Sequence, residues 1–543
     1  MTVRMSKVRA GMLAAGAAFA LAGCIDEKIV FRDRELFNAP ADSLGGFLGY
    51  FDAANKVTSC GNCHAEKQAA WVETGHARAY QDLQASGQAT GECFSCHTVS
   101  EKGNAATVAS GWSAVQDSAY HDVQCESCHG AGYQHVQSVL GGDVIRPLAS
   151  VAVDTGLANG CGECHAGEHQ PFLEQWAESK HGYGGEAYLE EGGRSPCKTC
   201  HEGRAAIELN FGNTNDFVEK ADTGVASYQP IVCATCHDPH DPFNEGQLRA
   251  PLGEPGLGQL CVKCHSRQGA PGASATRRGP HAAQGLLVID ETVGWIPPGF
   301  VFDTNDVVGS HGSSANKRLC ASCHVYMYEV TDAATGAFVF NSVGHTFEAI
   351  QCLDAQGKPT AGPCADNERN FKGCTVSGCH LTEGAARTAF QVVRARMDQL
   401  TDQLWTDDGD AVMETTDGGL LPKVLAQAIA ANNRNEMNLY DSKLSTAEGA
   451  IWNAQLAFTH NRTQWSSFVI EGQNTCTTAG CTTGGGSNTA HKSSGEGVHN
   501  PFLLEALLLG SIDAVRKQYG VSAPPFDETR RMTVPPGVRR ASR

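Results

Sequence analysis

The chain has 543 residues, with 23 cysteines, 21 histidines and a formal net charge of −18. An acidic chain lacks the basic face that nucleic acid requires, so we expect no nucleic-acid partner. Aromatic residues make up only 7% of the chain and 61 residues are glycine, so an apolar core of ordinary size is not expected. The many thiols indicate a bound metal, a cofactor or disulfides.

The N-terminus has the pattern of an export signal. Basic residues precede an apolar stretch of small residues, 11–22, which is too short to span a membrane. The stretch ends in Leu-Ala-Gly-Cys24, which resembles the lipobox of bacterial lipoproteins. We therefore expect a lipoprotein signal peptide at 1–23, a lipid on Cys24 and an N-terminal extension over 24–59. The alternative is an ordinary signal peptide with a chance cysteine.

Eight copies of Cys-x-x-Cys-His follow the extension. Composition alone predicts roughly 0.04 copies, and the motif is the attachment sequence of haem c. Its two thiols add to the two vinyl groups of one haem, and the adjacent histidine ligates the iron. A ninth site has four residues between its cysteines, a longer loop that also occurs in small multihaem cytochromes. The nine sites are Cys60-Cys63-His64, Cys93-Cys96-His97, Cys125-Cys128-His129, Cys161-Cys164-His165, Cys197-Cys200-His201, Cys233-Cys236-His237, Cys261-Cys264-His265, Cys320-Cys323-His324 and Cys374-Cys379-His380.

Zinc ribbons and disulfide frameworks also use cysteine pairs, but neither explains a histidine directly after each pair. Four cysteines remain beyond these sites and Cys24. We expect Cys352 and Cys364 to form a disulfide, because they are close in sequence. Cys476 and Cys481 resemble the ninth site without its histidine, so they form either a local disulfide or a degenerate haem site.

Residues 60–145 and 146–250 have the pattern of a tandem duplication of a three-motif unit. The last three motifs lie in 251–381. The residues that correspond in the two copies are Trp71 and Trp176, His76 and His181, and His135 and His240. We call the two copies repeat 1 and repeat 2.

Beyond the motifs, we expect a helical module over 382–519. Residues 386–404 and 444–458 have helical apolar spacing, and 407–419 is a polar break that contains glycine. The proline-containing segment 520–543 is expected to be an irregular tail.

On these motifs, residues 60–380 resemble the small tetrahaem electron carriers of ammonia oxidation and the wider doubled Cys-x-x-Cys-His cytochromes. Two later stretches, Ala-Glu-Gly-Ala-Ile-Trp-Asn at 447–453 and Gly-Val-His-Asn-Pro at 497–501, resemble the C-terminal part of large multihaem cytochromes, where the histidine before Asn-Pro reaches back to a haem. We expect a mostly α fold with long loops, little β-sheet and a haem-filled core.

Twelve histidines lie outside the motifs, which is enough to give each of nine irons a second ligand. Those that recur in the repeats, or resemble ligands of related cytochromes, are the strongest candidates. For the ninth place His169 is preferred to His121, and His460 and His491 are taken as ordinary polar residues. The expected second ligands are His76, His135, His169, His181, His240, His281, His311, His345 and His499.

The function expected from these sites is electron transfer along nine haems, including transfer at the cell exterior. Other cytochromes or redox proteins would be the partners, and a lipid would hold the protein on the outer membrane, because Ile25 and not aspartate follows Cys24. The alternative is a multihaem oxidoreductase of the nitrite, tetrathionate or hydroxylamine class with one open haem. No Cys-x-x-Cys-Lys motif of such enzymes occurs. An oligomer or filament is compatible with either function.

Overall fold

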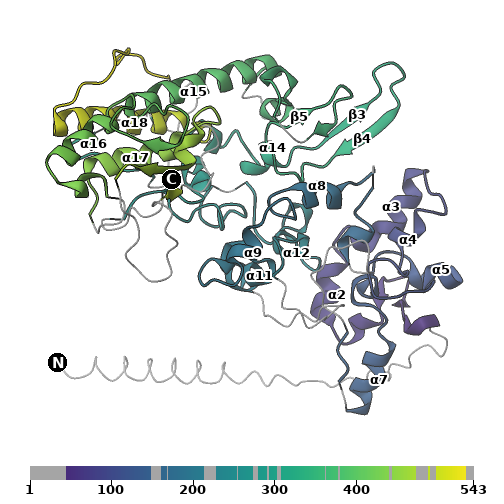
Figure 1. Ribbon diagram of the computed structural model, residues 1–543. Coiled ribbons are helices and arrows are strands. Elements are labelled where there is room, and N and C mark those ends of the chain that lie inside the picture. The colour runs from purple at the N-terminus through teal and green to yellow at the C-terminus, as the bar shows by residue number, and fades with distance from the viewer. Residues whose placement is uncertain are drawn as a thin grey trace, which may run out of the picture. The chain divides into compact units, whose positions relative to one another are not determined.

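Figure 1 shows the computed structural model of the chain, with its helices and strands labelled. The structure describes residues 44–142, 144–147, 160–167, 169–212, 228–253, 255–272, 279–289, 293–301, 307, 309–360, 363–376, 380–438, 443–472, 487–489 and 497–533. Within these ranges, no helix combines the length and the hydropathy that crossing a bilayer demands.

The first eight attachment motifs each form a single turn, and the ninth lies partly outside the described residues. Each turn places the two cysteines and the histidine close together, because the histidine N–H donates to the carbonyl of the first cysteine four residues earlier, at 2.9–3.2 Å where the motif begins at Cys60, Cys93, Cys161, Cys197, Cys233 or Cys261. The elements that carry motif residues are η2 (Cys60–Asn62), α4 (Phe94–His97), α6 (Cys125–His129), η5 (Cys161–Glu163), α10 (Lys198–His201), α12 (Cys233–Cys236), α14 (Cys320–His324) and η9 (Lys372–Thr375).

Short helices connect the motifs of the two repeats. Just before repeat 1, β1 (Tyr50–Asp52) pairs antiparallel with β2 (Val57–Thr58). The helices before and within repeat 1 are η1 (Leu44–Gly46), α2 (Ala65–Trp71), η3 (His76–Arg78), α3 (Ala79–Ser86), α5 (Trp112–Val115), η4 (Ser118–Tyr120) and α7 (Tyr133–Gly141). Those of repeat 2 are α8 (Phe172–Glu178), α9 (Ala187–Glu191), α11 (Gly203–Phe211) and η6 (Glu245–Gln247).

Two backbone-anchoring hydrogen bonds recur at the matching positions of the repeats. In repeat 1 the Trp71 indole donates to the Val123 carbonyl (3.0 Å), and the Val123 N–H donates to the His76 carbonyl (3.1 Å). The matching bonds of repeat 2 run from Trp176 to Ile231 (2.8 Å) and from Ile231 to His181 (3.0 Å). The duplicated residues therefore hold the same local structure in both copies.

Residues 251–381 contain the chain's short hairpins. Strands β3 (Tyr328–Thr331) and β4 (Phe338–Ser342) pair antiparallel, as do β5 (Cys352–Leu353) and β6 (Pro359–Thr360). The expected disulfide between Cys352 and Cys364 is confirmed. Besides the motif elements α14 and η9, the helices of this part are α13 (Gln284–Val288), η7 (Ser310–Gly312) and η8 (Asp366–Glu368).

The C-terminal part contains the longest helices, α15 (Glu383–Leu404) and α18 (Pro501–Tyr519). A capping box starts α17 (Thr446–Ala457), because Ser445 accepts from the Glu448 N–H and Glu448 accepts from the Ser445 N–H. Strand β7 (Val412–Met413) is parallel to β8 (Ser467–Ile470), which is antiparallel to β9 (Ser487–Thr489). The other helices are α16 (Leu421–Ala430), η10 (Arg434–Met437), α17 (Thr446–Ala457) and η11 (Thr463–Ser466).

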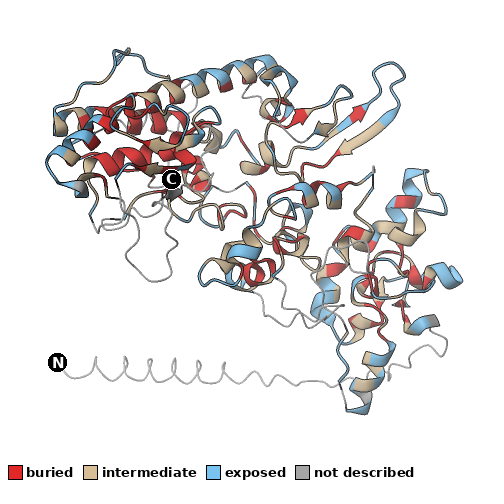
Figure 2. Cartoon of the chain, viewed as in Figure 1, coloured by how far each residue is buried: buried red, intermediate tan, exposed pale blue. Residues whose placement is uncertain are grey.

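The large apolar core of the described chain lies among these C-terminal helices, where Figure 2 shows the buried positions concentrated. Trp405, Trp452 and Trp465 are among its fully buried side chains. The helices of this module pack their own apolar side chains together, whereas the composition had led us to expect no apolar core of ordinary size. The apolar clusters around the motifs are small.

The mostly α fold with little sheet is confirmed. Both helices expected from apolar spacing are present as α15 and α17, and the polar break at 407–419 contains only the short strand β7. Described tail residues 521–533 form neither helix nor strand, as expected, but Phe526 and Met532 pack against the apolar core. The tail thus contributes to the module.

Candidate functional site

The structure brings together eight pairs of histidine rings, and in each pair one ring belongs to an attachment motif and the other does not. Their centroids lie 5.9–6.5 Å apart. The pairs are His64 and His135 (6.2 Å), His165 and His76 (6.2 Å), His129 and His240 (5.9 Å), His265 and His181 (6.0 Å), His201 and His281 (6.0 Å), His237 and His345 (6.4 Å), His380 and His311 (6.5 Å), and His324 and His499 (6.3 Å). Every non-motif ring in these pairs is one that the sequence put forward as a second ligand.

This separation matches two imidazoles on opposite sides of one metal ion. A histidine nitrogen binds a metal at about 2.0–2.1 Å, as in zinc sites, and the ring centroid lies roughly 1.2 Å behind it, so the two centroids would be roughly 6.4 Å apart. Direct ring stacking gives a much shorter distance, as between Tyr80 and His121 (3.6 Å). The paired rings therefore leave room for an iron, and their spacing fits a six-coordinate haem.

Backbone carbonyls orient many of these rings. A metal-bound histidine typically donates its other ring N–H to a carbonyl or carboxylate, which fixes the nitrogen that faces the metal. Here Nδ1 donates and leaves Nε2 for a ligand. The bonds are His97 to Ala79 (2.9 Å), His135 to Ile145 (2.8 Å), His237 to Gly246 (2.6 Å), His311 to Val498 (2.7 Å), His324 to Phe347 (2.8 Å) and His345 to Val343 (2.9 Å).

Burial keeps several of the paired imidazoles neutral, and only a neutral imidazole has a free lone pair for a metal. It lowers the pKa of His76 and of His345 to about 4, and that of His181 to about 3. The pKa values of His165 and His265 are lowered for the same reason. At neutral pH these side chains are ready to coordinate iron.

The motif cysteines line accessible space. Free cysteine is ordinarily among the most buried residue types. Here all seventeen described motif cysteines keep part of their surface accessible, and Cys63 and Cys128 are exposed. A thiol that must reach a vinyl group at the edge of a large planar ring needs such an opening, so the cysteines also fit haem c.

Thiols of different motifs touch one another. Each contact is a hydrogen bond between two cysteine side chains, and it joins motifs that are separated in the sequence. The pairs are Cys60 and Cys125, Cys96 and Cys164, Cys161 and Cys233, Cys200 and Cys264, Cys261 and Cys320, and Cys323 and Cys374. Haems attached at touching cysteines are near neighbours, a condition for passing electrons between them.

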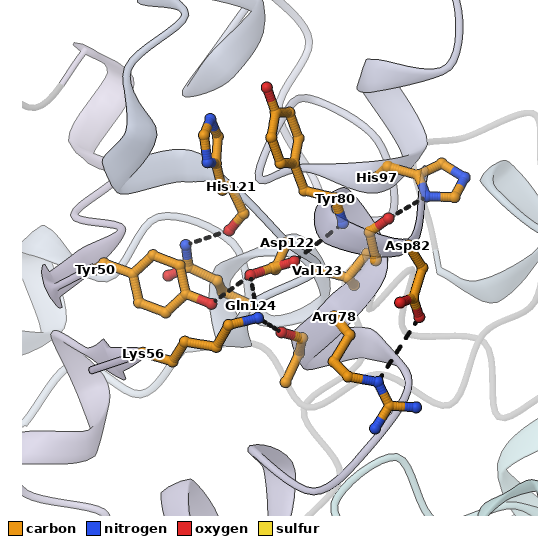
Figure 3. A network of polar contacts seen from close by, with 12 residues as sticks. Tyr50, Lys56, Arg78, Tyr80, Asp82, His97, His121, Asp122, Val123 and Gln124 are labelled. Atoms are coloured by element: carbon orange, nitrogen blue, oxygen red, sulfur yellow. Dashed lines mark hydrogen bonds and ion pairs between the residues drawn. The ribbon is translucent and has the colours of Figure 1, made fainter. Parts of the chain in front are cut away.

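His97 differs from the other motif histidines, because none of the ring contacts among the described residues brings a histidine to it. The spare histidine of this region, His121, instead stacks on Tyr80 (3.6 Å) and contacts Trp112 (5.0 Å). Figure 3 shows Tyr80 beside His121 and the ring of His97 bonded at Ala79. His121 is therefore held by aromatic packing.

A buried carboxylate fixes this arrangement. Asp122 accepts from the Tyr50 hydroxyl (2.9 Å), the Lys56 ammonium (3.1 Å) and the Tyr80 N–H (3.0 Å). These bonds, drawn in Figure 3, determine the backbone position of the preceding residue, His121. The network thus keeps the His121 ring on Tyr80.

One expected second ligand lies elsewhere, since His169 is exposed beside Phe338 (6.4 Å). His460, expected to be an ordinary polar residue, is also exposed. Sequence reasoning did not find the ring-orienting carbonyls or the pairing of the rings, because a carbonyl has no residue signature and the pairs join distant segments. Cys24, Cys379, Cys476, Cys481 and His491 lie outside the described residues.

Known proteins match parts of the chain. Residues 59–130 match the family described as cytochrome c554 and c-prime, and residues 154–266 match cytochrome c3. The chain is 31% identical over 160 residues to the C-type polyheme cytochrome OmcB of Geobacter sulfurreducens, a match that covers 27% of this chain and 19% of OmcB. It is 27% identical over 279 residues to the C-type polyheme cytochrome OmcC of the same species, covering 49% of this chain and 29% of OmcC. The chain thus aligns with less than a third of either relative. No solved structure matches it.

Proposed function

Because the chain is a multihaem c-type cytochrome, we propose that it holds nine haems c and transfers electrons among them. The eight pairs of histidine rings, each 5.9–6.5 Å apart, carry this proposal. When bound, a haem iron supplies reversible one-electron chemistry. The residues of this chain attach the rings, close both faces of eight irons and set the irons close together.

Closed irons favour electron transfer over substrate chemistry. An iron with two histidine ligands has no position for a substrate. What the protein can adjust at such an iron is its reduction potential, through ligand type, solvent exposure and nearby charge. The touching thiols, such as Cys261 with Cys320, support short distances between neighbouring haems. Burial lowers the pKa of imidazoles such as His76 and His181, so these side chains can bind a metal without a proton to displace.

A reductive titration of the full-length holoprotein tests this function. On an electrode, we expect nine reversible one-electron equivalents per chain, and an optical spectrum in which eight of the nine c-type haems are low-spin. Reoxidation by a soluble cytochrome of higher potential should be complete. A holoprotein that is reduced by dithionite but exchanges no electrons with any protein or electrode would contradict the proposal.

The second candidate function is a multihaem oxidoreductase of the nitrite, tetrathionate or hydroxylamine class. One observation favours it, which is that His97 meets no other histidine ring among the described residues. An iron held by His97 alone would have a position for a small ligand. Catalytic current on adding nitrite, tetrathionate or hydroxylamine to the same electrode would support this alternative.

We further propose that the protein is exported and lipid-anchored through Cys24 on the outer membrane, facing the periplasm or the cell exterior. The support is the Leu-Ala-Gly-Cys24 sequence and its preceding apolar stretch. Other cytochromes or redox proteins would be the partners, and extracellular transfer is the setting that a surface anchor fits.

A further inference from the structure

We propose that the two repeats exchange iron ligands. His76 of repeat 1 serves the haem attached at Cys161-Cys164-His165 of repeat 2, and His240 of repeat 2 serves the haem attached at Cys125-Cys128-His129 of repeat 1. This inference rests on the proposed function, because it requires a haem c at each of these motifs. The ring centroids of His76 and His165 are 6.2 Å apart, and those of His129 and His240 are 5.9 Å apart.

The motif nearest to His76 in the sequence is already served by another histidine. His76 follows His64 on the same segment, yet the ring that faces His64 is His135, at 6.2 Å and an interplanar angle of 22°. The ring of His76 is therefore free to face His165 of the other repeat.

The same holds for His240. It follows His237 almost directly, but the ring that faces His237 is His345, at 6.4 Å and 18°. His240 faces His129 with an interplanar angle of 26°. Ligation confined to each repeat would leave the His76–His165 and His129–His240 distances unexplained.

Local contacts hold both His76 and His240 in the positions from which they face the other repeat. The His76 carbonyl accepts from the Val123 N–H (3.1 Å), which ties the start of η3 to the residues just before the third motif. The Asp238 carboxylate accepts from the His240 N–H (3.0 Å) and contacts His240 Nδ1 (3.3 Å). A carboxylate on Nδ1 is a common partner of a metal-bound histidine, and it leaves Nε2 toward His129.

Further contacts join the two repeats near these ring pairs, and we call this region of contact between repeat 1 and repeat 2 the seam. The Cys96 thiol of repeat 1 hydrogen-bonds with Cys164 of repeat 2, and it also contacts the Glu163 carbonyl (3.9 Å). The Gly103 N–H donates to the Glu163 carboxylate (2.5 Å). The seam therefore has backbone, side-chain and thiol contacts beside the two exchanged ligands.

The forward exchange repeats along the chain. His76 follows the first motif and faces the fourth, and His181, its counterpart in repeat 2, follows the fourth motif and faces the seventh at His265 (6.0 Å). Each such histidine thus reaches three motifs ahead. A duplicated unit that lends its ligand to the next unit joins its haems to those of its neighbour, so the repeats are interlocked and not separable domains.

The test uses carbon monoxide titration of the reduced full-length holoprotein, read against the wild type. His76→Ala and the matched variant His135→Ala should each add one carbon monoxide equivalent per chain and one high-spin signal in the oxidised protein. Each is then combined with removal of one haem, through Cys60→Ala with Cys63→Ala or through Cys161→Ala with Cys164→Ala.

Crossed ligation predicts opposite outcomes for the two histidines. The site added by His76→Ala should disappear with the Cys161 and Cys164 changes and persist with the Cys60 and Cys63 changes, and the site added by His135→Ala should do the reverse. The inference is overturned if the His76→Ala site disappears with the first motif, or if His76→Ala adds no site while nine haems remain. Loss of haem from the wild-type motifs themselves would instead contradict the proposed function.

Should the combined variants fail to accumulate, His76→Met supplies a second measurement. A methionine ligand raises the potential of one haem and keeps its iron six-coordinate. A structure of that holoprotein identifies the iron that carries the methionine. Finding it at His165 supports the exchange, and finding it at His64 rejects it.

Discussion

The rings of His324 and His499 lie 6.3 Å apart and within 4° of parallel, although one belongs to the eighth motif and the other immediately precedes α18. Asn500 fixes this relationship. Its side chain caps α18 by accepting from the Leu503 N–H (3.1 Å) and donates to the Leu287 carbonyl (3.3 Å). The C-terminal module thus places a histidine at a distant attachment motif.

We therefore expect His499→Ala to open the iron attached at the eighth motif. The variant should bind one more carbon monoxide per chain than the wild type and gain one high-spin signal, because a single histidine leaves the sixth position free. His460→Ala is the control, since His460 is exposed and should leave the titration unchanged. An unchanged titration in His499→Ala would show that the C-terminal module supplies no ligand to the iron of the eighth motif.

The wild-type protein itself should have one open haem, at His97. His97 is oriented like the paired histidines, with Nδ1 on the Ala79 carbonyl (2.9 Å), but meets no second histidine ring among the described residues. We expect one carbon monoxide equivalent per reduced chain, lost on removing this haem through Cys93→Ala with Cys96→Ala. A wholly low-spin wild type would assign a histidine to this iron after all, such as His169 or the undescribed His491.

Nine haems are expected on the exported chain. Intact mass and a pyridine haemochrome assay should both give nine haem equivalents per polypeptide after expression with a cytochrome c maturation system. Eight would mean that the longer motif from Cys374 to His380 is not used. Ten would mean that Cys476 and Cys481 carry a haem without an adjacent histidine.

Cys24→Ala should release the protein from membranes. The lipid attached at this cysteine is the expected anchor, and no helix among the described residues could replace it by spanning the bilayer. Fractionation compares the variant with the wild type and with globomycin-treated cells. A variant that sediments with membranes as fully as the wild type would remove the lipid anchor.

A buried ion pair stabilises the C-terminal module. The Arg396 guanidinium donates to Glu505 at 2.6 Å, and both side chains are at most 4% exposed. Glu505 also accepts from the Met532 N–H (2.7 Å), which ties down the tail. Replacing one partner leaves the other charge buried and unpaired, so Glu505→Gln should lower the free energy of unfolding by about 3–5 kcal/mol.

Thermal and urea unfolding followed by far-ultraviolet circular dichroism measure this loss. Asp513→Asn is the matched control, because Asp513 pairs with Lys517 at 2.6 Å on the surface of the same helix, with side chains 51% and 76% exposed. An exposed pair is worth about 0–1 kcal/mol. Equal losses in the two variants would show that burial does not govern the Glu505 pair.

The sequence by itself determined the features that are local. An attachment motif needs only five to seven consecutive residues and one helical turn, so each motif was visible without a fold. The duplication was readable for the same reason, since Trp71 and Trp176 each follow the first motif of their repeat, and the two residues make the same bond. The helices α15 and α17 followed from apolar spacing.

Tertiary structure alone decided which rings face each other. A second iron ligand has no fixed spacing in the sequence from its motif, because it can come from any distant segment that packs beside the motif. His76 therefore faces His165 and not the nearby His64, and His499 reaches His324 from the last helix. The tertiary structure also decided where the remaining histidines lie. The His121 ring stacks on Tyr80, and His169 is exposed beside Phe338.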